Sequence, residues 1–220
     1  MLFVGLAIMA LGVSFSIKAD LGTSPISSLP YATSVVSGLS VGVTTAIMHG
    51  VLILIQIAIL RRDYDPFQLL QIPTSLFFSA AIDVAGLALQ GVTHASYLQQ
   101  WGLCIVGILL VGVGVALEVA SGTVTVPGEG TVLAICKKAP IKFSTMKICF
   151  DLTLVVLAVI TGLVFVGALV GVREGTLAAA LCVGLVARQA QRPIRWLQNR
   201  CFVSERVMHE APATDLRAGK

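Results

Sequence analysis

The chain has 220 residues, of which 56% are hydrophobic and only 12% are charged. Its mean hydropathy of +0.93 gives it more apolar surface than a soluble domain of this size can bury. The formal charge of +4 does not indicate a nucleic-acid partner, because the lysines and arginines lie at the ends of apolar segments and in a C-terminal tail, where they act as topology signals. The composition therefore predicts an integral membrane protein, with the lipid bilayer as its solvent.

The apolar segments, taken in chain order, predict six membrane spans. A bilayer core about 30 Å thick requires about 20 apolar residues per helix. The first segment, residues 2–17, has no basic region before it and no cleavage site after it, so we expect a retained span and not a signal peptide. The other predicted spans cover residues 41–60, 67–89, 102–120, 148–170 and 176–187, the last of which is short for a full crossing.

Two polar, helix-breaking segments interrupt this pattern at related places. Residues 20–31 follow the first span and residues 122–131 follow the fourth, and in each segment a threonine stands two residues before a proline. The first position of a helix tolerates proline, because its missing N–H would have no partner there anyway. We therefore expect short helices to begin at Pro25 and Pro127, the first of them ending near Gly38.

The offset that carries Pro25 onto Pro127 also aligns other residues, which predicts an internal duplication. Glycine, valine and alanine matches are common between any two apolar segments, so the matched Thr-x-Pro is the more specific part. The expected organisation is a first repeat at residues 1–90, a second at 91–190 and a basic cytoplasmic tail at 191–220. We expect an interfacial turn after residue 188, and then a mobile chain. The same offset superposes Gly5 on Gly107, Gly12 on Gly114, Thr23 on Thr125, Thr74 on Thr176 and His49 on Asp151.

The distribution of charge predicts that both termini are cytoplasmic. Arg61-Arg62, the lysines of residues 137–147 and the arginine-rich tail then all lie inside, and the uncharged loop at residues 90–100 lies outside. Because each repeat has three spans, an odd number, the two copies must face opposite ways. The expected fold class is an all-α integral membrane protein with about six transmembrane helices, arranged as an inverted 3+3 repeat with interrupted segments, as in many secondary transporters.

The two interrupted segments predict a binding site where they meet. Broken helices leave backbone groups unpaired, and these persist at membrane depth only beside protein or a cavity. Helix N-termini at Pro25 and Pro127 would supply N–H groups and partial positive charge that suit an anionic or polar solute. Ordinary interfacial turns are the alternative interpretation of both segments. The other expected substrate-binding residues are Gly22, Thr23, Ser24, Thr125 and Glu129.

Four ionisable residues in or near the spans, His49, Asp83, Glu118 and Asp151, are candidates for proton or ion coupling. A carboxylate at bilayer depth costs about 2.5–3.5 kcal/mol on insertion scales, so such groups usually face a bundle interior. His49 and Asp151 hold equivalent repeat positions and would approach each other at a two-fold axis; the alternative is an ion pair of Asp151 with Lys147, four residues earlier. The nearby turn favours an interfacial Glu118. Asp83 is deeper, which favours a functional or helix-pairing role.

Signatures of enzymes and metal sites are missing from the sequence. There is no HExxH, GxSxG or Walker motif, and the five cysteines include no CxxC pair. We therefore expect no enzyme activity, no bound metal and no cofactor. An intramembrane enzyme would instead need His49, Asp83, Glu118 and Asp151 to converge within hydrogen-bond reach.

Three sequence features together resemble one family. They are the run from Lys18 to Pro25 after the first span, Ile72-Pro73-Thr74 with Asp83 in the third, and Gly175-Thr176 at the start of the last. They resemble the YczE/YyaS/YitT-type family of small multi-pass bacterial membrane proteins, and the resemblance covers about residues 2–188. It implies a fold and a location in the bacterial inner membrane, but no substrate, because that family is largely uncharacterised.

The leading functional hypothesis is a small-solute transporter or channel that binds a polar or anionic solute between the interrupted segments. The competing hypothesis is a non-transporting membrane scaffold or regulatory partner, in which the polar breaks pack helices and the basic tail recruits a cytosolic protein. The lipid bilayer is the expected partner in both cases, and a homo-oligomer is compatible with either.

Overall fold

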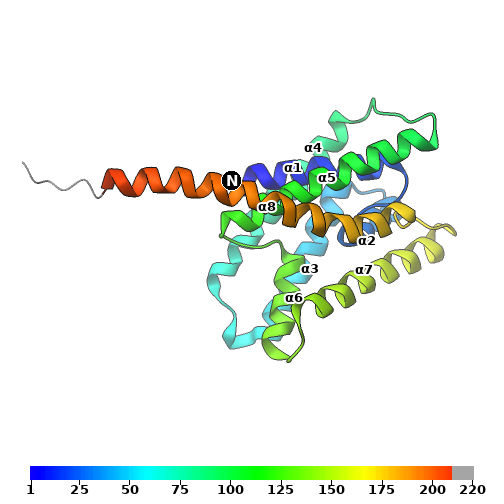
Figure 1. The fold of residues 1–220 in the computed structure, drawn as a ribbon. Helices are drawn as coiled ribbons and strands as arrows, with labels where there is room; N and C mark the ends of the chain where they lie inside the picture. Colours follow the sequence, from blue (N-terminus) through cyan, green and yellow to red (C-terminus); the bar gives the residue numbers. More distant parts are fainter. Residues whose placement is uncertain (210–220) are drawn as a thin grey trace, which may run out of the picture.

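A computed structural model describes the backbone of residues 1–209 and the side chains of residues 1–194. Within these residues the chain is helical, with two short 3-10 segments and no strand (Figure 1). The elements are α1 Leu2–Ala19, α2 Pro25–Ser37, α3 Val41–Leu60, η1 Arg61–Asp63, η2 Pro66–Leu70, α4 Gln71–Ala88, α5 Tyr97–Ser121, α6 Pro127–Lys138, α7 Phe143–Phe165 and α8 Glu174–His209.

Five segments of the described chain are long and apolar enough to cross a membrane. The prediction of an all-helical protein with several membrane-length helices is therefore confirmed. The sixth predicted span, the apolar start of α8, is not among the five, since Arg188 closely follows it. The five candidate spans are Leu2–Ala19, Val41–Asp63, Pro66–Ala88, Tyr97–Ser121 and Phe143–Phe165.

Several helix ends differ from prediction. α5 and α7 each begin five residues earlier than expected, at Tyr97 and Phe143. α7 ends at Phe165 and not at residue 170, because Gly167 and Gly171 adopt positive φ values of 74° and 73° that end regular helix. The turn expected after residue 188 is wrong: α8 continues through Pro193 to His209. Residues 188–209 include five arginines and three glutamines, which favour helix, and the proline removes only one helical hydrogen bond. The rest of the expected tail, residues 210–220, lies outside the described residues.

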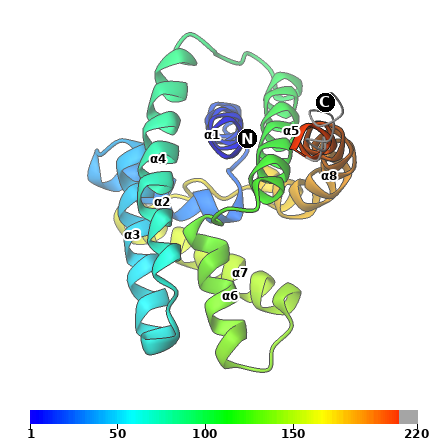
Figure 2. The same cartoon turned by 90° about the vertical axis from the view of Figure 1, so that its left-hand side faces the viewer.

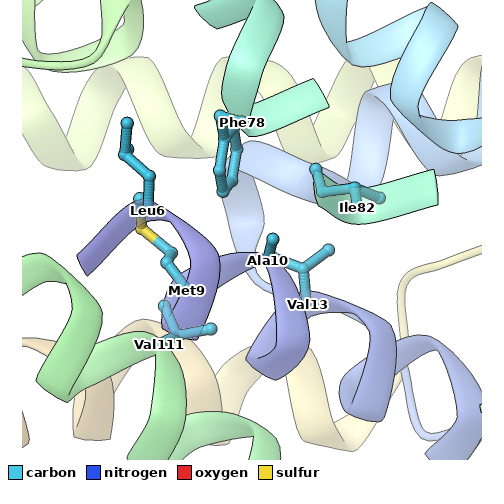
Figure 3. Packing of buried hydrophobic residues seen from close by; sticks show 7 residues of the cluster. All are labelled: Leu6, Met9, Ala10, Val13, Phe78, Ile82 and Val111. Atoms are coloured by element: carbon cyan, nitrogen blue, oxygen red, sulfur yellow. The ribbon is translucent and has the colours of Figure 1, made fainter. Parts of the chain in front are cut away.

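α1 is surrounded by other helices and forms the centre of the main core. Figure 2 shows α1 end-on between α4 and α5, with α8 on the far side of α5. The core side chains come from α1, α4 and α5 (Figure 3), and are Leu6, Met9, Ala10, Val13, Phe78, Ile82 and Val111.

α1 and α5 touch through their backbones. A Cβ placed on Gly5 would lie 2.9 Å from the Gly114 carbonyl oxygen, and one placed on Gly12 would lie 2.8 Å from the Gly107 carbonyl oxygen. The earlier glycine of one helix thus faces the later glycine of the other, so the two helices run antiparallel. Small residues at such crossings allow the close packing on which helix association in lipid depends.

The two short helices pack on long helices from the other half of the chain. α2 packs mainly against α7, and α6 packs against α3, which also contacts α4. Figure 2 shows α3, α6 and α7 together on one side of α1. The short helices are therefore held by partners that are distant in sequence.

Replacing Gly107 by Leu should destabilise the fold. Its side chain would have to displace the backbone of α1 at Gly12, and overpacking of this kind costs about 1–3 kcal/mol. Gly102, on the same helix, provides the matched control, because a Cβ placed on it would have nothing within 4 Å. Denaturant unfolding of the detergent-purified variants measures the effect. Equal unfolding midpoints for Gly107→Leu and Gly102→Leu would contradict it.

Candidate functional site

The two interrupted segments meet at the starts of their short helices. α2 begins at Pro25 and α6 at Pro127, as the sequence predicts. A Cβ placed on Gly128 would contact the side chain of Ile26, so the second residues of the two helices lie against each other. The ring of Phe150, from α7, lies 3.8 Å from the same point. The N-termini of two helices from different halves of the chain are thus neighbours.

A small cavity lies beside this meeting point, and we call it the inner cavity. Its volume is about 40 Å³, and because one water needs about 10–15 Å³ of such volume, it has room for two or three. The hydroxyls of Ser24 and Ser27 are 3.0 Å apart and hydrogen-bonded to each other. The residues that matter most in its lining are Ser24, Ser27, Thr45, His49, Phe78 and Val126.

His49 is the unusual member of this lining. The residue is only 2% exposed, and its Nδ1 has no hydrogen-bond partner among the described residues. Its ring stacks on Phe78 with centroids 6.0 Å apart. Buried polar atoms almost always have a partner, so an unpaired ring nitrogen beside a cavity is available to a bound molecule.

A second pocket lies on the other side of the first break, and we call it the vestibule. Its volume is about 210 Å³, and it shares no lining residue with the inner cavity. Of the expected binding residues, Gly22 and Thr23 line the vestibule, whereas Ser24 lines the inner cavity. The lining of the vestibule includes Asp20, Gly22, Thr23, Tyr31, Gly171 and Arg173.

Gly22 fits its position because the chain approaches it closely. Its φ is +93°, and a Cβ there would lie 2.6 Å from the backbone nitrogen of Arg173. The next residue, Thr23, donates its N–H to the Gly171 carbonyl oxygen at 3.0 Å. The break before α2 is therefore paired with the loop between α7 and α8.

The break before α6 is paired in a different way. Glu118 accepts the N–H of Val126 through Oε1 at 2.7 Å and is only 3% exposed. The carboxylate is buried within the protein, where it caps an otherwise unpaired N–H. The interfacial position of Glu118 stays a prediction. Glu129 lies in the first turn of α6. Thr125 is half-buried and does not line the inner cavity.

Asp83 stabilises the start of α3. Its Oδ1 accepts the Gly42 N–H at 2.8 Å, and its Oδ2 accepts the Ser40 hydroxyl at 2.7 Å. Ser40 is the N-cap residue of α3 and itself accepts the Val43 N–H. The geometry matches the helix-pairing alternative for Asp83, since a carboxylate on α4 binds the N-terminus of α3.

Asp151 has a local partner. Lys147 donates to its Oδ1 at 2.9 Å, which is the ion-pair alternative, and no hydrogen bond or ion pair joins Asp151 to His49 among the described residues. His49, Asp83, Glu118 and Asp151 thus have four separate sets of contacts. Within the described part of the chain, no group of three or more His, Cys, Asp or Glu side chains is placed to hold a metal ion.

Two buried amides were missed by the sequence reasoning. Gln56, which is 0% exposed, donates through Nε2 to Gln71 Oε1 at 3.1 Å and to the Pro127 carbonyl oxygen at 3.0 Å. A Cβ placed on Gly130 would lie 2.9 Å from each amide, so both side chains pack on α6. The sequence does show a glutamine inside an apolar span. A glutamine carries no charge, however, and the search for functional groups at membrane depth was a search for charged side chains.

Comparison with known proteins places the chain among relatives of unknown function. Over 188 residues it is 29% identical to the "Uncharacterized protein YyaS" of Bacillus subtilis (strain 168), covering 84% of this chain and 92% of that protein. The predicted resemblance is thereby confirmed for YyaS. No solved structure matches the chain. A family model matches residues 1–192, and the chain therefore belongs to the family described as "Family of unknown function (DUF6198)".

Proposed function

We propose that this protein is a small-solute transporter or channel of the bacterial inner membrane, with both termini in the cytoplasm, and that its solute binds in the inner cavity. The observation that carries the proposal is that His49, whose buried Nδ1 has no partner among the described residues, lines the inner cavity together with Ser24, the N-cap of α2. Helix N-termini supply N–H groups and partial positive charge, and the hydroxyls of Ser24 and Ser27 add two groups that can turn toward a ligand.

The composition and size of the inner cavity favour a particular solute class. Among the described residues, neither a carboxylate nor a lysine or arginine lines it, and much of its lining is apolar. A volume of about 40 Å³ fits only a few non-hydrogen atoms. The proposed solute is accordingly a small neutral polar molecule or a small monovalent anion.

An inverted 3+3 repeat accounts for how the helices pair. A two-fold relation requires that residue i contacts residue j of the partner, and that residue j contacts residue i. The repeat offset makes Gly107 the equivalent of Gly5 and Gly114 the equivalent of Gly12. The contacts are exchanged as this relation requires, because Gly5 faces Gly114 and Gly12 faces Gly107. Likewise α1 packs on α4 as α5 packs on α8, and α2 packs on α7 as α6 packs on α3. In this arrangement α8 is the sixth span.

Two of the four candidate residues are best placed to couple transport to a proton. His49 lines the inner cavity, and Glu118 caps the break that leads into α6. A proton gained at Glu118 would change the hydrogen bond to the Val126 N–H, and a proton gained at His49 would change the charge beside the inner cavity. Asp83 and Asp151 are instead engaged with the start of α3 and with Lys147, which favours structural roles for both.

Substitution in the inner cavity should reduce solute movement without unfolding the protein. We expect His49→Leu and Ser24→Ala to lower uptake of labelled formate or nitrate into proteoliposomes by about tenfold, because each removes a polar group worth about 1–2 kcal/mol to a bound solute. Thr153→Ala, on an exposed face of α7, is the matched control. Unchanged uptake of both probes in both variants, with the control active, would count against this site.

Glu118 offers a test that separates capping from coupling. Glu118→Gln keeps an oxygen that can accept the Val126 N–H, whereas Glu118→Leu leaves that N–H unpaired, at a cost of about 1–3 kcal/mol. We expect only the leucine variant to unfold at a lower denaturant concentration. If Glu118 also couples transport, Glu118→Gln will fold normally but lose the pH dependence of uptake. A retained pH dependence would assign Glu118 to capping alone.

The scaffold alternative is favoured by one observation. α8 extends well beyond the other helices (Figure 1), and the sequence of its second half contains several arginines. Truncation after residue 200 distinguishes the two functions. A transporter should retain uptake in proteoliposomes after truncation, whereas a scaffold should lose its cellular function although the membrane-embedded part remains folded.

A further inference from the structure

The vestibule and the inner cavity follow one another along α1. Met9 and Val13 line the inner cavity, whereas Ser16 and Asp20, one and two turns further on, line the vestibule. The order of these residues sets the order of the two pockets. The vestibule therefore lies beyond the inner cavity, toward the C-terminal end of α1.

α2 and its break form the wall between the two pockets. Thr23 faces the vestibule and its neighbour Ser24 faces the inner cavity; further along α2, Pro30 faces the inner cavity and its neighbour Tyr31 faces the vestibule. At two places, then, consecutive residues line opposite pockets. The wall is a single non-helical stretch of chain at Thr23 and Ser24, and it is the helix α2 itself at Pro30 and Tyr31.

A loop closes over this wall from the other half of the chain. We call residues 166–173 the strap. Its hydrogen bonds to the break include Thr23 N–H to Gly171 O at 3.0 Å and Arg173 Nη1 to Asp20 O at 2.8 Å. The start of α8, directly after the strap, adds Gly175 N–H to Leu21 O at 2.8 Å. A loop between two helices is thus fastened to a segment about 150 residues earlier.

The strap also contacts the aromatic ring of Tyr31. A Cβ placed on Gly171 would lie 2.8 Å from Cδ1 of Tyr31, so the strap backbone and the ring are in direct contact. The phenol ring has no room to move toward the strap while Gly171 stays in place. Displacement of Tyr31 in that direction consequently requires the strap to lift.

The outer fastening of the strap is exposed to solvent. The side chains of Asp20 and Arg173 are 67% and 41% exposed, and their charged atoms are 3.8 Å apart. Exposed ion pairs contribute little stability, so this fastening is weak. Gly167 and Gly171, both at positive φ, provide two points at which the strap backbone can change direction.

We propose that the vestibule and the inner cavity are consecutive compartments of one path, and that Tyr31, held by the strap, is the gate between them. This gate deepens the proposed function and relies on it only for the identity of what moves along the path. With Tyr31 in place the inner cavity is separated from the vestibule. When the strap lifts at Arg173, the Tyr31 ring is released, the start of α2 can shift with it, and the two compartments join.

Cysteine labelling tests the gate without any solute. In a background with the native cysteines replaced, Ser27→Cys reports on the inner cavity and Val35→Cys reports on the vestibule. The probe is a small, membrane-impermeant, cationic methanethiosulfonate, added to sealed spheroplasts and, separately, to inverted vesicles. Ser79→Cys, buried on α4 and lining neither pocket, detects general loosening of the fold.

We expect Val35→Cys to react readily from one side of the membrane and Ser27→Cys to react slowly from that side. Tyr31→Ala should accelerate labelling of Ser27→Cys by about tenfold or more, and Arg173→Gln should accelerate it through the strap. Tyr31→Phe, which keeps the ring, should not accelerate it. Ser79→Cys should stay unreactive in every variant.

The gate is overturned if Ser27→Cys labels at the same rate with and without Tyr31→Ala and Arg173→Gln while Val35→Cys reacts. It is also overturned if Ser79→Cys accelerates in parallel with Ser27→Cys in both variants, because general loosening then explains the result. Accelerated labelling in a protein that moves neither formate nor nitrate would support the gate and count against the proposed function, so the two fail independently.

Discussion

The backbone contact between α1 and α5 is the constraint on which the rest of the structure depends. In lipid, apolar side chains gain little by leaving one apolar environment for another, so helices associate where close packing is available. Gly5 and Gly12 provide it on α1, and Gly107 and Gly114 provide it on α5. Because the two helices are antiparallel, their C-terminal ends lie at opposite ends of the pair. The segments that follow them must return from opposite directions, and they meet at Ile26 and Gly128.

Each break then presents the same physical problem, and each is solved with different groups. A segment that leaves regular helix frees backbone N–H and C=O groups, which need partners away from water. The Thr23 N–H binds a carbonyl of the strap, the Val126 N–H binds the Glu118 carboxylate, and the Pro127 carbonyl accepts from Gln56. Some buried polar atoms of the described residues have no partner, among them His49 Nδ1, Gln56 Oε1 and the hydroxyls of Ser75 and Ser79. Of these residues, His49 is the one that lines the inner cavity, where a bound molecule could supply the missing partner.

Local sequence rules predicted the helices and breaks but not the contacts between them. Proline at the first helical position and glycine at the end were sufficient to bound α2 at Pro25 and Gly38. The strap was not predictable, because Gly171 meets Thr23 only through the packing of helices that are distant in sequence. The glutamines that hold α6 were missed for a similar reason: an amide in an apolar span has no evident partner until α3, α4 and α6 are placed together. α8 extends beyond its predicted end because the residues around Pro193 favour helix by more than one proline disfavours it.

The two breaks are also unequal in a way that bears on mechanism. In the proposed inverted repeat, Ser16 corresponds to Glu118 and Arg173 corresponds to Gln71. Around the first break, Ser16 and Arg173 line an open pocket of about 210 Å³. At the second break, the Glu118 side chain occupies the capping position, and Gln71 is buried against α6. Residues at equivalent repeat positions thus line an open pocket at the first break, but are buried in contacts with protein groups at the second. A transporter that alternates between two such states would exchange these roles, opening a pocket beside the start of α6 while the pocket beside the start of α2 closes.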